Sequence, residues 1–274
     1  MPISQQIPRY TTSCDTEIER FRRDGFIIVR GQADAGLCRR MQEFIIKSLH
    51  PATGPLEYEV DVEYPGSPVS RLAPGGETPR RLLNAYSRDE MFRNWATSAP
   101  LISTLSRLLA NERITLSQSH HNCIMTKHPG FSSETHWHQN IRYWSFDRPD
   151  LITVWLALGD EHPENGGLSL IPGSHCSNFD RGRFDAALFL REDLPENRAL
   201  IDGARSIVLN AGDVLFFHCL SLHAAGRNTT DETKFSLVFA YHTEANRPIP
   251  RTRSAKYPDI ELAARRSSYE PHRG

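Results

Sequence analysis

The segment SIVLNAGDVLFFHCLSLHAAG (206–226) decides the fold class of this chain. Its apolar centre, VLFF, has the length and composition of a buried strand, and the flanking residues form further short runs of β-forming side chains separated by turns. Five other segments after residue 111 have the same character, namely ITLSQSHHNCIMTKHPG (114–130), HWHQNIRYW (136–144), LITVWLALGD (151–160), LSLIPGSH (168–175) and TKFSLVFAYHT (233–243). A run of strands without alternating helices predicts a β-sandwich or jelly-roll core.

The part of the chain before residue 111 has a mostly helical pattern. Apolar residues recur with helical spacing in DTEIERFRRDG (15–25) and ADAGLCRRMQEFIIKSLH (33–50), and the short strand FIIVRG (26–31) separates them. Helices first and strands afterwards predict an α+β, mainly β architecture. We expect a single domain (1–274) whose N-terminal part, residues 1–110, is mostly helical and contains a Pro/Gly-rich lid-like loop at 51–79. A jelly-roll core follows at 111–246 and contains a polar, partly helical insertion at 176–203. A polar, loosely held tail spans 247–274.

The composition limits the kind of partner. The chain has 33 acidic and 32 basic residues and a net charge of -1, without long runs of one charge, so it has no signature of nucleic-acid or membrane-surface binding. We expect a small-molecule partner. The five cysteines have no CxxC spacing, which argues against a disulfide framework and a structural zinc site. No apolar run has the length of a signal peptide or membrane span, so we expect a cytoplasmic protein; the oligomeric state is open.

Histidines in two of the expected strands carry the chemistry. His136, His138 and Asn140 occupy alternate positions, which in a strand face the same side. A second pair, His218 and His223, lies in the distant core segment that opens this section. First-row metals that keep positions open for substrate and oxygen typically take two imidazoles and one carboxylate, so the sequence supplies the imidazoles of such a site.

Several motifs in this order resemble one known family. WHQN (137–140), TVWLALGDEHPENGGLSLIPGSH (153–175), AGDVLFFHCLSLHAAGRN (211–228) and the strand that begins at residue 233 resemble the phytanoyl-CoA dioxygenase family of iron- and 2-oxoglutarate-dependent oxygenases. The resemblance covers about residues 116 to 242, and RFRRDGFIIVRG (20–31) is similar to the family's opening. It implies a double-stranded β-helix, a cupin-like jelly roll with N-terminal helices packed on one sheet. It also implies a dioxygenase that uses Fe(II), 2-oxoglutarate and O2 to hydroxylate an unactivated C–H bond of a small substrate.

The resemblance assigns the metal-binding and catalytic positions to His138, Asn140 and His223. The family's motif is His-x-Asp followed much later by a histidine, and His138 and Asn140 stand in its first part. His223 is preferred to His218 because small residues and then an asparagine follow it, as the family's distal ligand requires. Asn140 departs from the family, which has an aspartate there.

Asn140 leaves three interpretations open. A neutral amide is a weaker ligand for Fe(II) than a carboxylate, so the affinity for metal is expected to be lower. The chain is then an inactivated variant of an enzyme whose natural residue is aspartate, or a natural member with weak or reassigned activity. In the third interpretation another donor, His136 or Glu134, completes the metal shell.

The resemblance also assigns the binding site of 2-oxoglutarate. The family holds the distal carboxylate of this co-substrate with an arginine eleven residues after the distal histidine, and that position is Lys234 here. A lysine pairs with a carboxylate as a point charge, without the two-pronged geometry of arginine. Ser236 shares the strand face of Lys234 and is expected to assist it, with Lys127 as the alternative cation.

Substrate-contacting residues are predicted only from their context. They are Ser174, His175, Trp144 and Arg71. The sequence does not name the substrate. Two other classes of function compete with the oxygenase: a degenerate, non-catalytic jelly-roll protein that binds a small molecule, and a jelly-roll metalloprotein that uses another metal.

Overall fold

The computed structural model describes residues 13–263, and within them the strands form two antiparallel sheets. The large sheet contains β1 (Phe26–Val29), β2 (Leu56–Tyr58), β3 (Pro79–Leu83), β4 (Arg113–Ser117), β5 (Cys123–Lys127), β7 (Ile152–Ala157), β10 (Val214–His218), β12 (Lys234–Thr243) and β13 (Ile260–Ala263). The small sheet contains β6 (Thr135–His138), β8 (Leu168–Leu170), β9 (Arg205–Ser206) and β11 (His223–Ala225), in the order β6-β11-β8-β9.

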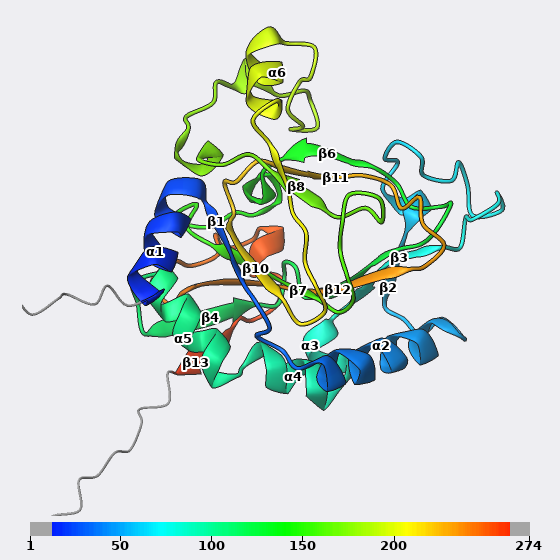
Figure 1. The fold of residues 1–274 in the computed structure, drawn as a ribbon, viewed down its shortest axis with the longest axis horizontal. Coiled ribbons are helices and arrows are strands. Elements are labelled where there is room, and N and C mark those ends of the chain that lie inside the picture. The colour runs from blue at the N-terminus through cyan, green and yellow to red at the C-terminus, as the bar shows by residue number, and fades with distance from the viewer. Residues whose placement is uncertain (1–12, 264–274) are drawn as a thin grey trace, which may run out of the picture.

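The helices lie mainly on one side of this sandwich. They are α1 (Ser13–Asp24), α2 (Ala35–Leu49), α3 (Ala85–Arg88), α4 (Glu90–Ala96), α5 (Ala99–Leu108) and α6 (Pro195–Ile201). Helices α2, α4 and α5 run along the outer face of the large sheet, and the segment around α6 lies beyond the small sheet (Figure 1). The predicted fold, a mainly β jelly roll with N-terminal helices on one sheet, is confirmed, and so are the two helices around the first strand.

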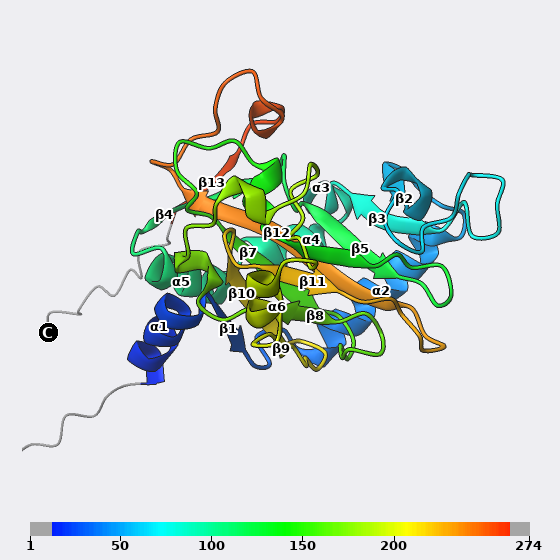
Figure 2. The same cartoon turned by 90° about the horizontal axis from the view of Figure 1, so that it is seen from above.

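Strand β7 shows how the sequence builds both layers of the core. Val154 and Leu156 pack against the helices, whereas Trp155 and Ala157, at the alternate positions, pack between the two sheets. Every residue of β7 is buried, as expected for a central strand covered on both faces. Burying one large apolar side chain contributes about 1.5–3 kcal/mol, so this strand is a major source of stability. Its neighbour β12 is a long strand that pairs with β7 on one edge and with β5 and β4 on the other (Figure 2).

The lid-like loop and the insertion differ in detail from the prediction. Part of the 51–79 segment is ordered as β2, which pairs with β3, and as a 3-10 turn that buries Glu59. The predicted helical content of the 176–203 insertion lies in α6, not in FDAALFLRED (184–193), where only an isolated bridge joins Phe184 to Leu190. Phe184 and Leu190 of that stretch pack in a cluster on the outer side of the small sheet, whereas Phe189 packs against Tyr64 and His138.

The predicted loose tail is held in place as far as the structure describes it. Strand β13 pairs with β4, and the buried Ser254 hydroxyl bonds both the His120 ring, at 2.7 Å, and the Ser145 backbone N–H, at 2.8 Å. These contacts are between segments more than 100 residues apart, so the local polar composition did not reveal them. The last part of the tail, 264–274, lies outside the described residues. No helix within residues 13–263 combines the length and apolar character that crossing a membrane requires.

Candidate active site

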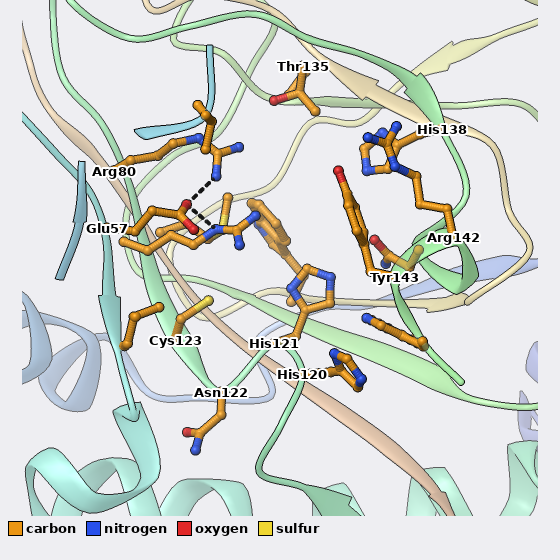
Figure 3. Close-up of a pocket in the computed structure, with 18 of the residues that line it drawn as sticks. Glu57, Arg80, His120, His121, Asn122, Cys123, Thr135, His138, Arg142 and Tyr143 are labelled. Carbon is orange, nitrogen blue, oxygen red and sulfur yellow. Dashed lines mark hydrogen bonds and ion pairs between the residues drawn. The ribbon is translucent and has the colours of Figure 1, made fainter. Parts of the chain in front are cut away.

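A cavity of about 730 Å³ opens between the two sheets. Its lining comes from strands of both sheets and from the 3-10 turn Asn140–Tyr143. Within this cavity His138, Tyr143 and Arg142 lie on one side, and the ion pair of Glu57 with Arg80 lies on the other (Figure 3). Residues of the predicted metal site and co-substrate site therefore share one enclosed space.

His138 and His223 are brought together by the pairing of β6 with β11. They are register partners in the small sheet, and their ring centroids are 4.2 Å apart. Each Nδ1 lies against a backbone carbonyl, that of His136 at 2.8 Å and that of Ser221 at 3.0 Å. A carbonyl only accepts, so each Nδ1 carries the proton and each Nε2 keeps its lone pair.

The electrostatics of this pair suit metal ligation. Burial lowers the pKa of His138 well below its usual range, with the neighbouring His223 adding to the effect. Burial likewise lowers the pKa of His223 to about 4. Both rings are therefore neutral at pH 7, which is the form that binds a metal. The tethered Nδ1–H groups fix the ring orientations, as is usual for metal-bound histidines.

Asn140 lines the same cavity as the two imidazoles, but not through the strand alternation that the sequence suggested. Strand β6 ends at His138, and Asn140 begins a 3-10 turn. The side chain is 2% exposed, and its Nδ2 donates to the Thr153 hydroxyl at 2.9 Å. With Nδ2 engaged, the carbonyl oxygen is the atom left for another partner, and the His121 ring lies close enough to interact with the Asn140 side chain. The described donors thus fit a metal held by two imidazoles and one neutral amide oxygen.

The alternative donors predicted from the sequence are not brought into this shell. Thr135 and His138 line the cavity, whereas His136 and Glu134 lie outside its lining, because a bulge interrupts the pairing of β6 with β11 and breaks the expected alternation. Within residues 13–263 no three His, Cys, Asp or Glu side chains form a group that could hold a metal. The rejected distal histidine, His218, lies outside the lining too.

His121 is a site residue that the sequence reasoning missed. It lines the cavity from a left-handed backbone conformation, with φ of 44°, and its Nδ1 is buried with no hydrogen-bond partner among the described residues. Burial, followed by the charge of Arg81, lowers its pKa to about 3. The signal in the sequence was only the pair of adjacent histidines at 120 and 121, which has no strand or helix periodicity.

Lys234 and Ser236 lie side by side on β12, as their alternate positions require, but neither is free. The Lys234 Nζ donates to a carboxylate oxygen of Glu161 at 3.0 Å and to the Ser236 Oγ at 3.1 Å. The Ser236 hydroxyl donates to the other oxygen of Glu161 at 2.6 Å. Glu161, which the sequence reasoning did not single out, therefore already holds the two groups predicted for 2-oxoglutarate.

Lys127, the alternative cation, is the register partner of Lys234 and lines the same cavity. Its Nζ donates to the backbone carbonyls of Ser133 at 2.5 Å and Gly226 at 2.7 Å. Burial lowers its pKa to about 7. Two of its three N–H groups therefore tie the chain together, which leaves one for a ligand.

The predicted substrate residues divide into two groups. Trp144 lines the cavity and packs against the His121 ring at a centroid distance of 5.3 Å. Ser174, His175 and Arg71 lie outside the lining. The Ser174 hydroxyl donates to Ile171 and accepts from the backbone N–H of Leu222, so it holds the turn. His175, predicted from the turn that it shares with Ser174, contacts Cys176. Arg71, predicted because it flanks the Pro/Gly-rich loop, pairs with Asp61 at 2.8 Å.

Comparison with known proteins places the fold and the family. Residues 21–236 match the family described as Phytanoyl-CoA dioxygenase (PhyH). An ectoine dioxygenase of Stutzerimonas stutzeri (strain A1501) is 21% identical over 271 residues, which cover 93% of this chain and 84% of that protein. The human peroxisomal phytanoyl-CoA dioxygenase is 29% identical over 121 residues, 40% of this chain and 35% of that one.

Solved structures show the same fold. The epimerase SnoN, in a complex with Fe3+, alpha ketoglutarate and nogalamycin RO, has a TM-score of 0.69 and 22% identity, and the match covers 87% of this chain and 86% of SnoN. EctD from S. alaskensis, with 2-oxoglutarate and 5-hydroxyectoine, has a TM-score of 0.70 and 19% identity, over 89% and 81% of the two chains.

Proposed function

The chain belongs to the phytanoyl-CoA dioxygenase family, and on that premise we propose that it is an Fe(II)- and 2-oxoglutarate-dependent oxygenase that hydroxylates an unactivated C–H bond of a small organic substrate. The oxygenase class follows from the family. We further propose that the reaction is a hydroxylation and that the metal ligands are His138, Asn140 and His223. The co-substrate residues, the single-domain organisation and the cytoplasmic location expected from the sequence are likewise proposed.

One observation carries the assignment. His138 and His223 are two buried, neutral imidazoles whose Nδ1–H groups are tethered to backbone carbonyls while both Nε2 atoms stay free. Neither Nε2 bonds a described residue, and neither is among the fully buried atoms without a partner, so both lone pairs open onto the cavity and are available to a ligand. A metal bound here would be held by the Nε2 atoms of His138 and His223.

The bound iron, together with 2-oxoglutarate and O2, supplies the oxidising power for the C–H bond. The residues of the chain bind and orient the reactants. Asn140 offers its carbonyl oxygen as a neutral third donor, since Thr153 holds the amide nitrogen. Lys234 lines the same cavity as His223 and is proposed to face the distal carboxylate of the co-substrate.

The 51–79 loop and the insertion contact each other and the ring of His138. The Tyr64 hydroxyl in the 51–79 loop and the Tyr143 hydroxyl are 2.8 Å apart, and the ring of Phe189 from the insertion packs at 5.5 Å from Tyr64 and 5.8 Å from His138. The loop and the insertion thus meet at the metal side of the cavity. We propose that they form its lid, which keeps the reaction from solvent.

The substrate is proposed to carry an acidic group. The lining contains seven cationic side chains against two carboxylates, Glu57 and Glu63; the cations are Arg80, Arg81, Lys127, Arg142, Lys234, Arg253 and Lys256. Arg142 Nη1 is buried with no hydrogen-bond partner among the described residues, whereas Arg81 Nε lies 3.4 Å from a carboxylate oxygen of Glu57. Guanidinium groups with free N–H atoms are suited to a carboxylate or phosphate.

A non-catalytic small-molecule binder is the second candidate, and the same fold supports it. The neutral Asn140 weakens the metal site, and the pairing of Lys234 with Glu161 weakens the co-substrate site. If the protein is such a binder, it would bind an anionic molecule in the cavity without needing a metal. The experiment below separates it from the oxygenase.

The test is calorimetric titration of Mn(II), a stand-in for Fe(II) without its reactivity towards oxygen, into the wild type and into His138→Gln, His223→Gln and His218→Gln. We expect the first two variants to lose at least about tenfold in affinity, because each removes one of two imidazole ligands. His218→Gln is the matched control and is expected to bind as the wild type does.

Uncoupled turnover completes the test of the oxygenase. With Fe(II), O2 and 2-oxoglutarate, the wild type is expected to form succinate slowly, and His223→Gln is expected to form none above background. If all four proteins bound Mn(II) equally weakly and formed no succinate, the oxygenase assignment would be wrong and the binder would take its place.

A further inference from the structure

A carboxylate of the chain itself is buried where the cavity ends. Glu161 is 1% exposed and accepts from three side chains: the Lys234 ammonium at 3.0 Å, the Ser236 hydroxyl at 2.6 Å and the Trp155 indole N–H at 3.0 and 3.1 Å. The donors are 5%, 0% and 4% exposed respectively. Together they form a closed carboxylate-binding seat, and Glu161 fills it.

The fold fixes this arrangement from both sides. Glu161 follows β7, and its backbone N–H and C=O both bond Leu209, at 2.8 and 2.9 Å, which holds its side chain inward. Strand β12 lies next to β7, with Ser236 opposite Ala157, so alternation places Lys234 and Ser236 on the face toward the gap between the sheets. Four residues from two strands and a loop therefore converge without a mobile element.

The seat faces the same cavity as the two histidines. Lys234 and Trp155 line the cavity together with His223, whereas Glu161 and Ser236 lie behind them, outside the lining. The ammonium is held 5.1 Å from the centre of the Trp155 ring. A ligand that extends from the histidines toward Lys234 thus meets a cation that is already paired, with one N–H left to offer.

We propose that Glu161 is an internal competitor for the distal carboxylate of 2-oxoglutarate and so determines which co-substrate the site accepts. This inference rests on the proposed function. An incoming carboxylate gains little from a neutralised Lys234 and is repelled by the Glu161 charge close behind it in a buried, weakly screened place. The chain therefore discriminates poorly between 2-oxoglutarate and 2-oxo acids that lack the second carboxylate.

The test compares two ligands by calorimetry in the presence of excess Mn(II): 2-oxoglutarate, and 2-oxobutyrate, which has no distal carboxylate. The proteins are the wild type and Glu161→Gln, each also in an Asn140→Asp background that strengthens the metal site. Glutamine keeps the shape of Glu161 and an acceptor for the indole N–H but removes the charge. We expect Glu161→Gln to raise the affinity for 2-oxoglutarate at least tenfold and to change that for 2-oxobutyrate less than twofold.

Glu57→Gln is the matched control, because it removes a carboxylate from another part of the lining, on β2 of the large sheet, where Glu57 pairs with Arg80 at 2.8 Å and with Arg81 at 3.4 Å. It is expected to leave the ratio of the two affinities unchanged. An equal gain for 2-oxoglutarate in Glu57→Gln and Glu161→Gln would overturn the inference, since the effect would then be one of net charge. A double variant, Glu161→Gln with Lys234→Gln, is expected to lose the gain because it lacks the cation.

The remaining outcomes separate this inference from the proposed function. If 2-oxoglutarate bound the wild type and Glu161→Gln equally, the inference would be wrong and the oxygenase assignment would stand. If it bound no variant in either background, both would be wrong. The wild type alone gives an independent check should Glu161→Gln not fold: a preference of more than about a hundredfold for 2-oxoglutarate over 2-oxobutyrate contradicts a competing carboxylate in the seat.

Discussion

Substitution of Asn140 by aspartate is expected to reverse the effect of metal on the stability of this protein. Asn140 is 2% exposed and lines the same cavity as two neutral imidazoles, so the change adds a buried negative charge with almost no change in shape. Without metal the charge has no partner in the shell and destabilises the fold. With a divalent metal the same charge becomes the strongest ligand of the site.

The magnitudes follow from burial and charge. An uncompensated buried carboxylate costs about 3 kcal/mol, which for a domain of this size lowers Tm by roughly 6–12 °C. A unit charge about 4 Å from a divalent ion gains about 8 kcal/mol at an effective dielectric constant near 20. In the metal-bound protein about 5 kcal/mol of this remains as net stabilisation after the cost of burial. The metal affinity gains more, because the cost of burial is the same with and without metal, and we expect a gain of at least about a thousandfold.

Scanning calorimetry with and without Mn(II), together with titration of Mn(II), measures both effects. Asn122→Asp is the matched control, because Asn122 also is buried and lines the cavity, but its side-chain oxygen accepts from the Tyr86 backbone N–H away from the histidines. It is expected to lose stability without gaining metal affinity. An Asn140→Asp variant that melted as the wild type does and bound Mn(II) no more tightly would refute the assignment of position 140 to the metal shell.

Three further substitutions test other buried positions. Burial lowers the pKa of His120 to about 3, below its unfolded value of about 6.5. The neutral ring therefore contributes fully to the free energy of unfolding above pH 6.5, and this contribution is lost on acidification. Between pH 6 and 4, denaturant titrations are expected to show the wild type losing up to about 1.4 kcal/mol per pH unit more than His120→Asn. Burial lowers the pKa of Lys127 to about 7, so between about pH 7 and 10 the unfolded chain binds a proton at this lysine that the folded chain does not. The free energy of unfolding of the wild type should therefore rise over that range relative to Lys127→Met, and parallel curves of this free energy against pH would contradict the prediction. A Cβ at Gly212, where φ is +91°, would lie 2.1 Å from the Ala33 carbonyl oxygen, so Gly212→Ala should lower the free energy of unfolding by more than about 2 kcal/mol in chemical denaturation. Gly31 also has a positive φ, but a Cβ there would have nothing within 4 Å, so Gly31→Ala should cost only about 1 kcal/mol.

The local pattern of the sequence was sufficient for the fold class. Runs such as VLFF (214–217) and the fully buried β7 have strand composition and length, and they became central strands. The strand after the first helix and the helix stop before Pro51 were also read correctly. Local signals fail where a segment depends on distant partners, as in the 247–263 segment, which β4 and the His120 ring hold.

The motif predicts His138, Asn140 and His223 as the metal ligands, and the structure brings the two imidazole rings to 4.2 Å from each other, with Asn140 in a 3-10 turn that lines the same cavity. A period of two holds only while a strand continues, and the chain leaves β6 directly after His138. His121 could not be found by periodicity, because its side chain enters the cavity from a left-handed residue outside any strand.

The sequence by itself thus determined the sheets, the helices and the identity of the two imidazoles, because these depend on neighbouring residues and on a motif read in order. Only the tertiary structure decided which polar groups share a buried space. Glu161 lies in a polar stretch, GDEHPENGG (159–167), that looks solvated in sequence, yet it is 1% exposed and pairs with Lys234, 73 residues away. A buried charge needs a partner, and the packing of distant strands decides which oppositely charged group lies close enough to pair with it. The local spacing of residues in the sequence does not contain this information.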